Sequence, residues 1–146
     1  KDKVLSYILS KSSTANVNKI TKDGTTPLHL AAYGNHLTCC ILLINHGAQI
    51  DQKNSYACDI SHWCALGGSN DVLLWLSKIN YSLSLKQKEG HTPLHKAVLK
   101  EHIKTIDLLL GLLSENQINI KDNNGFTAHD LAIQLNLVEI INLLAR

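Results

Sequence analysis

A seven-residue segment that returns at a fixed spacing constrains this chain more than any other feature. Residues 26–32 (TPLHLAA) recur as residues 92–98 (TPLHKAV), and residues 59–65 (DISHWCA) carry the same frame midway between them. A fourth copy, residues 127–133 (TAHDLAI), follows after a slightly longer step. The histidines of the first three copies are spaced 33 residues apart: His29, His62 and His95. A fixed period of this length predicts one small unit repeated along a stack.

Each copy has the features of a helix start. A threonine at the first position can accept a hydrogen bond from the free N–H groups of the first turn, and Pro27 and Pro93 follow where a missing N–H does no harm. Small residues such as Ala31 and Ala32 then allow neighbouring helices to approach closely. Apolar residues at helical spacing and the stop signal at Gly47 mark a second helix. The first full unit is therefore predicted to hold helices over residues 27–34 and 37–46.

The period and the TPLH-type segment resemble the ankyrin repeat, over nearly all 146 residues. The resemblance implies an all-α solenoid of stacked helix-turn-helix units joined by hairpin loops. It divides one domain into an N-terminal half repeat, whose helix we expect around residues 4–9, a full repeat, a degenerate repeat, a repeat with a two-residue insertion and a C-terminal capping repeat. These parts are residues 1–22, 23–55, 56–88, 89–123 and 124–146.

The second unit departs most from the pattern. Ser61 stands in place of leucine, Ile60 in place of proline and Ala57 in place of the turn glycine. We expect this unit to be the least stable, with Trp63 and Trp75 compensating by burying large apolar surfaces. In the third unit the insertion around residues 111–116 is expected to lengthen the second helix or to enlarge the loop after it.

Composition restricts the setting in which the chain works. The formal net charge is only +2, and no run of like charges suggests a nucleic-acid partner. No apolar run approaches the roughly 20 residues of a membrane span, so we expect no membrane contact. Four cysteines without paired spacing predict buried, reduced thiols in the cytoplasm or nucleus. Because the chain lacks methionine and begins at Lys1, we expect a fragment of a longer protein, on the cytosolic face if that protein is membrane-bound.

The periodic histidines suit structure better than metal binding. Copies one repeat apart lie too far from each other to share an ion with ligand distances near ~2.1 Å. The resemblance implies instead that His29 and His95 hydrogen-bond the threonine of their own motif and tie adjacent turns together. In the second unit Asp59 replaces that threonine beside His62, and a carboxylate favours the charged imidazole. A structural pair is the main interpretation there, and proton sensing is the alternative.

Two other residue sets have the chemistry of a site without its geometry. Asp59, Ser61 and His62 are the residue types of a hydrolytic triad, and Cys58, His62 and Cys64 are those of a zinc site. Successive helical residues point about 100° apart, so neither set converges. We predict no catalytic residue, metal or cofactor. The lysines of the third unit form either a solvated face or a contact for an acidic partner: Lys86, Lys88, Lys96, Lys100 and Lys104.

By resemblance, the function is to bind another protein or peptide as a monomer, through a concave groove formed by hairpin tips and the ends of the first helices. The family's variable positions fall on Lys22, Asp23, Thr25, Tyr33, Ser55, Tyr56, Cys58, Leu66, Lys88, Glu89, His91, Leu99, Lys100, Asn123, Asn124 and Phe126. Tyr33, Leu66 and Leu99 share one repeat position, with Gln134 as the fourth member. We expect an apolar strip facing the groove; the alternative is that these side chains cover the adjacent helix.

The identity of the partner does not follow from the sequence, and two other settings remain open. One is a regulatory or substrate-recruiting segment of a larger enzyme, such as an acyltransferase or kinase, or of an ion channel. The other is a repeat protein delivered into a host by a virus or bacterium.

Overall fold

The structure is a computed structural model that describes residues 17–145. The helix expected around residues 4–9 lies outside the described residues. The described part is helical and contains no strand. Four helix pairs follow one another: α3 (Pro27–Tyr33) with α4 (Leu37–Asn45), α5 (Ile60–Gly67) with α6 (Asn70–Lys78), α7 (Pro93–Leu99) with α8 (Ile103–Leu112), and α10 (Ala128–Gln134) with α11 (Val138–Leu144).

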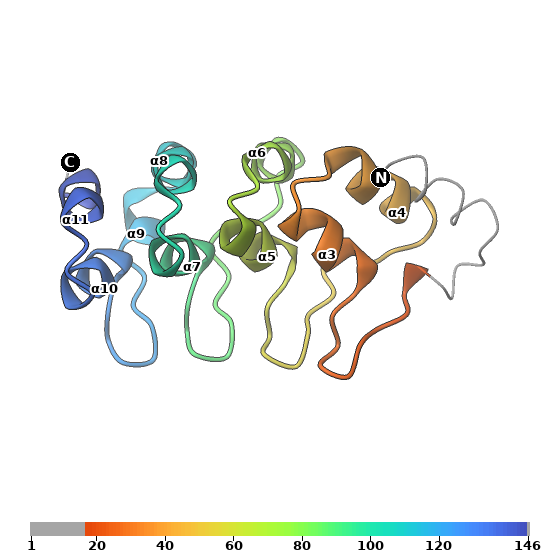
Figure 1. Cartoon of the computed structure of the whole chain (residues 1–146), viewed down its shortest axis with the longest axis horizontal. Coiled ribbons are helices and arrows are strands. Elements are labelled where there is room, and N and C mark those ends of the chain that lie inside the picture. The colour runs from red at the N-terminus through yellow and green to blue at the C-terminus, as the bar shows by residue number, and fades with distance from the viewer. Residues whose placement is uncertain (1–16, 146) are drawn as a thin grey trace.

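The helix pairs stack side by side into a two-layered solenoid. The first helices form one row, the second helices form another, and the hairpin loops all project on the same side of the stack (Figure 1). Helices α3, α5 and α7 pack mainly against neighbouring first helices, whereas the terminal α10 packs about equally against α7 and its own partner α11. The predicted all-α stack of helix-turn-helix units is confirmed.

The first helices begin where the repeated motif predicts. The Thr26 hydroxyl accepts a hydrogen bond from the His29 amide, and the His29 ring accepts one from the Thr26 amide, which closes a capping box. The same reciprocal cap opens α5, α7 and α10, with Asp59 in place of threonine in α5. These caps satisfy N–H groups that would otherwise lack partners.

The core lies between the two rows and is built from small and medium apolar side chains. Leu28 and Leu94 are 1% exposed, and Ala32, Ala65 and Val98 are fully buried. Neighbouring first helices approach so closely that a Cβ atom on Gly67, at the end of α5, would lie 2.0 Å from the carbonyl oxygen of Tyr33, at the end of α3. Both tryptophans, Trp63 and Trp75, are partly buried against this core.

The buried histidines connect successive units. The Nε2 atoms of His29, His62 and His95 lie 2.9–3.0 Å from backbone carbonyl oxygens in the hairpin that follows each unit: Gln52, His91 and Phe126. Burial lowers the pKa of His29 and His95, which keeps these rings neutral. The structural interpretation of His29 and His95, a bond to the motif threonine and a tie to the next turn, is confirmed.

The second unit contains a buried polar cluster around Asp59, of which the sequence predicted only the pair with His62. The Ser61 hydroxyl donates to Asp59 Oδ1 (2.5 Å), the Tyr81 hydroxyl donates to Asp59 Oδ2 (2.6 Å), and His62 Nδ1 lies 3.0 Å from Oδ1. Burial opposes ionisation of Asp59, but its interactions with His62, Ser61 and Tyr81 outweigh that effect and hold its pKa below the usual range. Ser61, which stands in place of leucine, is therefore a hydrogen-bonding partner of Asp59.

The hairpin turn of the second unit has the same left-handed backbone conformation as the other turns, although alanine replaces glycine there. Ala57 has φ of 59°, in the left-handed region where the other hairpins place Gly24, Gly90 and Gly125. A side chain in this region strains the backbone, as expected from the replacement.

The insertion in the third unit makes an additional short helix. Helix α8 has 10 residues, one more than α4 and α6, and α9 (Glu115–Ile118) follows in the loop. Ser114 caps α9 through the amide of Gln117, and the Gln117 side chain also donates to the Ser84 hydroxyl (3.2 Å). The insertion thus lengthens the helix slightly and also gives the loop its own structure.

Candidate protein-binding groove

The hairpin tips form one continuous row. An amide of each hairpin donates to a carbonyl of the hairpin before it: Ser55 to Asp23 (2.8 Å), Lys88 to Tyr56 (2.9 Å) and Asn123 to Glu89 (3.0 Å). Because these bonds join backbone to backbone, the spacing of the tips does not depend on which side chains they carry. The row is a fixed frame on which side chains can vary.

Each turn is also held by one side chain at its start. The Asn54 side-chain oxygen accepts from two amides in its turn, at 3.0 Å each, and Gln87 and Asp122 do the same in the next two hairpins. The tips are therefore preorganised before any partner arrives, which reduces the ordering that binding would require.

A hollow of about 260 Å³ lies where the first three hairpins meet helices α5 and α7. It contains five of the predicted partner-binding residues: Asp23, Tyr56, Cys58, Leu66 and Glu89. It also contains four that the sequence reasoning did not select: Asn54, Trp63, Gln87 and Lys96. Of these four, Trp63 could have been selected from the sequence, because it shares a repeat position with Lys96 and with Leu30, which is half-exposed.

Aromatic side chains dominate this part of the groove. The Trp63 ring stacks on the His29 ring, with centroids 5.9 Å apart, and meets the Tyr33 ring edge-on at 6.0 Å. Tyr33 and Tyr56 remain 48% and 54% exposed. The Trp63 indole N–H is buried and has no acceptor within the described part of the chain. Large, ordered aromatic surface beside a concavity is typical of binding sites.

Charged groups flank the aromatic surface. Hydrogen bonds from the hydroxyls of Thr21 and Thr25 lower the pKa of Asp23, so its carboxylate is ionised at neutral pH. On the other side of the hollow the Lys96 ammonium lies 3.8 Å from the Glu89 carboxylate. Lys96, one of the lysines of the third unit, thus lines the hollow and pairs with Glu89 there.

Two of the predicted partner-binding residues are buried in the structure. Thr25 is 5% exposed because its hydroxyl turns inward to Asp23, and Cys58 is 6% exposed beneath the hairpin. Asp23, Leu66, His91 and Phe126 are partly buried, and His91 pairs with Asp122 at 3.3 Å. The remaining ten are exposed: Lys22, Tyr33, Ser55, Tyr56, Lys88, Glu89, Leu99, Lys100, Asn123 and Asn124.

The residues at the ends of the first helices, predicted either to face the groove or to cover the adjacent helix, do some of each. Tyr33 packs on Trp63 of the next unit and still exposes about half of its surface. Leu99 is 36% exposed, Leu66 is partly buried, and Gln134 is exposed. The strip is therefore partly packed and partly available for contact.

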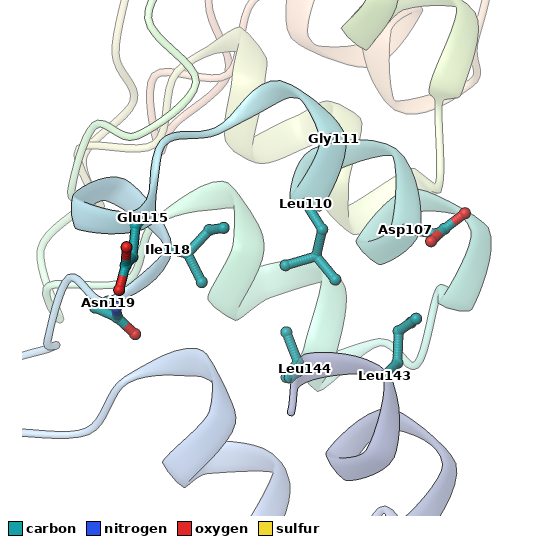
Figure 2. Close-up of a pocket in the computed structure, with 8 residues that line it drawn as sticks. All are labelled: Asp107, Leu110, Gly111, Glu115, Ile118, Asn119, Leu143 and Leu144. Carbon is teal, nitrogen blue, oxygen red and sulfur yellow. The ribbon is translucent and has the colours of Figure 1, made fainter. Parts of the chain in front are cut away.

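A larger hollow of about 830 Å³ lies on the other layer of the molecule, between α8, α9 and α11. Leucines from α8 and α11 line it, and Glu115 of α9 and Asn119, which follows α9, stand at one side (Figure 2). It arises because the insertion places α9 beside the end of α8. It lies apart from the hairpin tips.

Residues 17–145 contain neither a metal-binding cluster nor a membrane-spanning helix. No group of three histidine, cysteine, aspartate or glutamate side chains is placed to hold a metal ion. No helix in this range has both the length and the apolar character needed to cross a bilayer.

Comparison with known proteins gives a consistent result. The family profile described as "Ankyrin repeats (3 copies)" matches residues 1–84 and 61–146. "Putative ankyrin repeat protein FPV031" of Fowlpox virus is 32% identical over 150 residues, which cover 97% of this chain. The "Transient receptor potential cation channel subfamily A member 1 homolog" of Caenorhabditis elegans is 34% identical over 95 residues, 64% of this chain. "Probable 26S proteasome regulatory subunit p28" of Saccharomyces cerevisiae is 28% identical over 131 residues, 89% of this chain.

The chain spans only part of each of these relatives. The matched regions are 42% of the fowlpox protein, 8% of the channel homolog and 57% of the proteasome subunit.

Proposed function

Because the chain belongs to the ankyrin-repeat family, whose repeats are in general protein-interaction modules, we propose that it binds a protein or peptide in the groove beside its hairpin tips, without catalysis. One observation carries the proposal: the tips are fixed in a row by backbone hydrogen bonds while large apolar side chains, including Tyr33, Tyr56 and Leu99, stay exposed beside them. Exposed apolar side chains on a rigid, concave frame mark an interaction site.

The test is capture of partners by the whole chain used as bait, compared with a variant in which Tyr33, Leu66 and Leu99 are all changed to serine. The matched control changes Ile41 to serine on the second-helix layer, because Ile41 is 37% exposed and Leu99 is 36% exposed. Circular dichroism first confirms that all three proteins are folded. We expect the groove variant to lose partners that the control keeps. A groove variant that is less stable yet retrieves the same partners at low temperature would contradict the proposal.

A second candidate is the same binding role within a larger enzyme or ion channel. The similarity to a channel homolog, of which the chain spans 8%, favours this setting. The sequence of the parent protein decides: a catalytic or membrane-spanning segment supports this candidate, and further repeats alone contradict it. The similarity to a poxvirus protein supports the third setting, delivery into a host, in which the groove would bind a host protein.

The four cysteines support location in a reducing compartment, the cytosol or nucleus. All four cysteines are buried and none forms a disulfide within the described residues, and burial raises the pKa of the Cys40 thiol to about 12. Such thiols are unreactive and need no disulfide partner.

A further inference from the structure

We propose that the hollow over the second unit is the specificity pocket of the groove, and that it takes one large apolar side chain from a partner segment that carries a lysine or arginine beside that residue. This inference rests on the proposed function, because it names what the same groove binds.

The size of the hollow favours a single side chain. Its volume of about 260 Å³ lies below the roughly 300–1,000 Å³ of pockets that hold small-molecule ligands. Tyr56, Trp63 and Leu66 supply aromatic and apolar walls. Filling a pocket of this kind with one anchor residue is how protein interfaces concentrate their binding energy.

The walls are held in place before binding. Trp63 stacks on His29, and His29 is itself fixed by hydrogen bonds to Thr26 and to the Gln52 carbonyl. Tyr56 sits on a turn that Asn54 holds through two backbone amides. A preformed pocket loses little side-chain freedom when a partner enters it.

The pocket is specific to the second unit. At the repeat position of Trp63 the neighbouring units carry Leu30 and Lys96. At the hairpin position of Tyr56 they carry Asp23 and Glu89, so an aromatic ring stands between two carboxylates on adjacent tips. The unit that departs most from the family pattern therefore has the most distinctive surface of the groove.

The charges on the two sides select the residue next to the anchor. Glu89 already has a cation, since Lys96 lies 3.8 Å away. Asp23 is ionised and accepts from two hydroxyls, and no described lysine, arginine or histidine lies within ion-pair distance of it. A cation beside the anchor residue would pair with Asp23, and an acidic residue there would be repelled.

The test uses a phage-displayed library of random 12-residue peptides, selected on the whole 146-residue chain. We expect enriched peptides to share a leucine, methionine or aromatic residue next to a lysine or arginine. A pocket variant, Tyr56→Ser with Leu66→Ser, should weaken their binding about tenfold or more. Asp23→Asn, which keeps an acceptor for the turn, should weaken it several-fold and reduce its dependence on salt. The control Glu115→Lys, at the other hollow, should leave binding unchanged.

Two groove variants separate failure of this inference from failure of the proposed function. Peptides that bind the pocket variant as tightly as the parent chain, but lose binding to a distal groove variant (Leu99→Ser with Asn123→Ala), would overturn the pocket and leave the groove intact. Peptides unaffected by either variant would overturn both. Enriched peptides without the apolar and basic pair, or no enrichment at all, would overturn the pocket. Circular dichroism and thermal melting confirm that each variant is folded.

Discussion

The buried cluster around Asp59 makes a quantitative prediction about stability. Tyr81→Phe removes the hydroxyl that donates to Asp59 Oδ2 at 2.6 Å and keeps the ring. Hydrogen bonds to charged groups contribute about 1.5–3 kcal/mol. Tyr81 is only partly buried and Asp59 retains its bonds from the Ser61 hydroxyl and from the Ser61 and His62 amides, so we expect the lower end of that range. A loss of about 1.5 kcal/mol corresponds to a fall of roughly 3–6 °C in the melting temperature of a chain of this size.

The assay is urea unfolding followed by circular dichroism, with Tyr56→Phe as the matched control. The Tyr56 side chain is 54% exposed, and its hydroxyl makes no hydrogen bond within the described part of the chain. The control should be as stable as the parent chain to within about 0.5 kcal/mol. The double variant with Asp59→Asn should lose less than the sum of the two single changes, because the two groups interact directly.

The stabilisation that comes from the Asp59 carboxylate should depend on pH. The pKa of Asp59 is lower in the folded chain than its ordinary value of about 4. The stabilisation is therefore complete above about pH 4 and is lost as the pH falls through the lowered folded pKa. The difference in the free energy of unfolding between the parent chain and Tyr81→Phe should narrow once Asp59 becomes protonated in the folded chain. Equal stability of the two proteins at pH 7 would refute the reasoning.

Further predictions concern packing in the same region. Gly67→Ala should destabilise the chain by about 1–3 kcal/mol, because its Cβ would lie 2.0 Å from the Tyr33 carbonyl oxygen. Gly111→Ala in helix α8 should stabilise the chain by about 0.5–1 kcal/mol, because no atom lies within 4 Å of the added Cβ. Equal melting temperatures of the two variants would contradict this pair of predictions. Ser61→Leu should destabilise, because the site is fully buried and the hydroxyl bonds Asp59; Ser61→Ala measures the lost bond alone, and a leucine variant more stable than the parent chain would show that space is available.

The sequence predicted the fold because its signals are local and periodic. The cap of each first helix involves residues three positions apart, so the motif that repeats in the sequence is the motif that forms the cap. The bond between a histidine and the following hairpin repeats with the same period. Most of the exposed groove positions follow from that period too.

The remaining features depend on contacts that periodicity does not encode. The Tyr81–Asp59 bond joins residues 22 positions apart and depends on how the chain returns after α6. Thr25 and Cys58 occupy variable positions yet turn inward, because neighbouring side chains of the hairpin, Asp23 and Asn54, bind their hydroxyl and amide respectively. The capped helix α9 follows from an insertion whose effect on the backbone depends on Ser114 and Gln117 together.

The most direct test of the groove is amide hydrogen exchange of the whole chain, alone and bound to a captured partner or selected peptide. The account predicts slower exchange on binding at the hairpin tips around residues 55–57 and 88–90 and along α5, with little change in α4, α6, α8 and α11. Protection confined to the second-helix layer, with unchanged exchange at the tips, would contradict it.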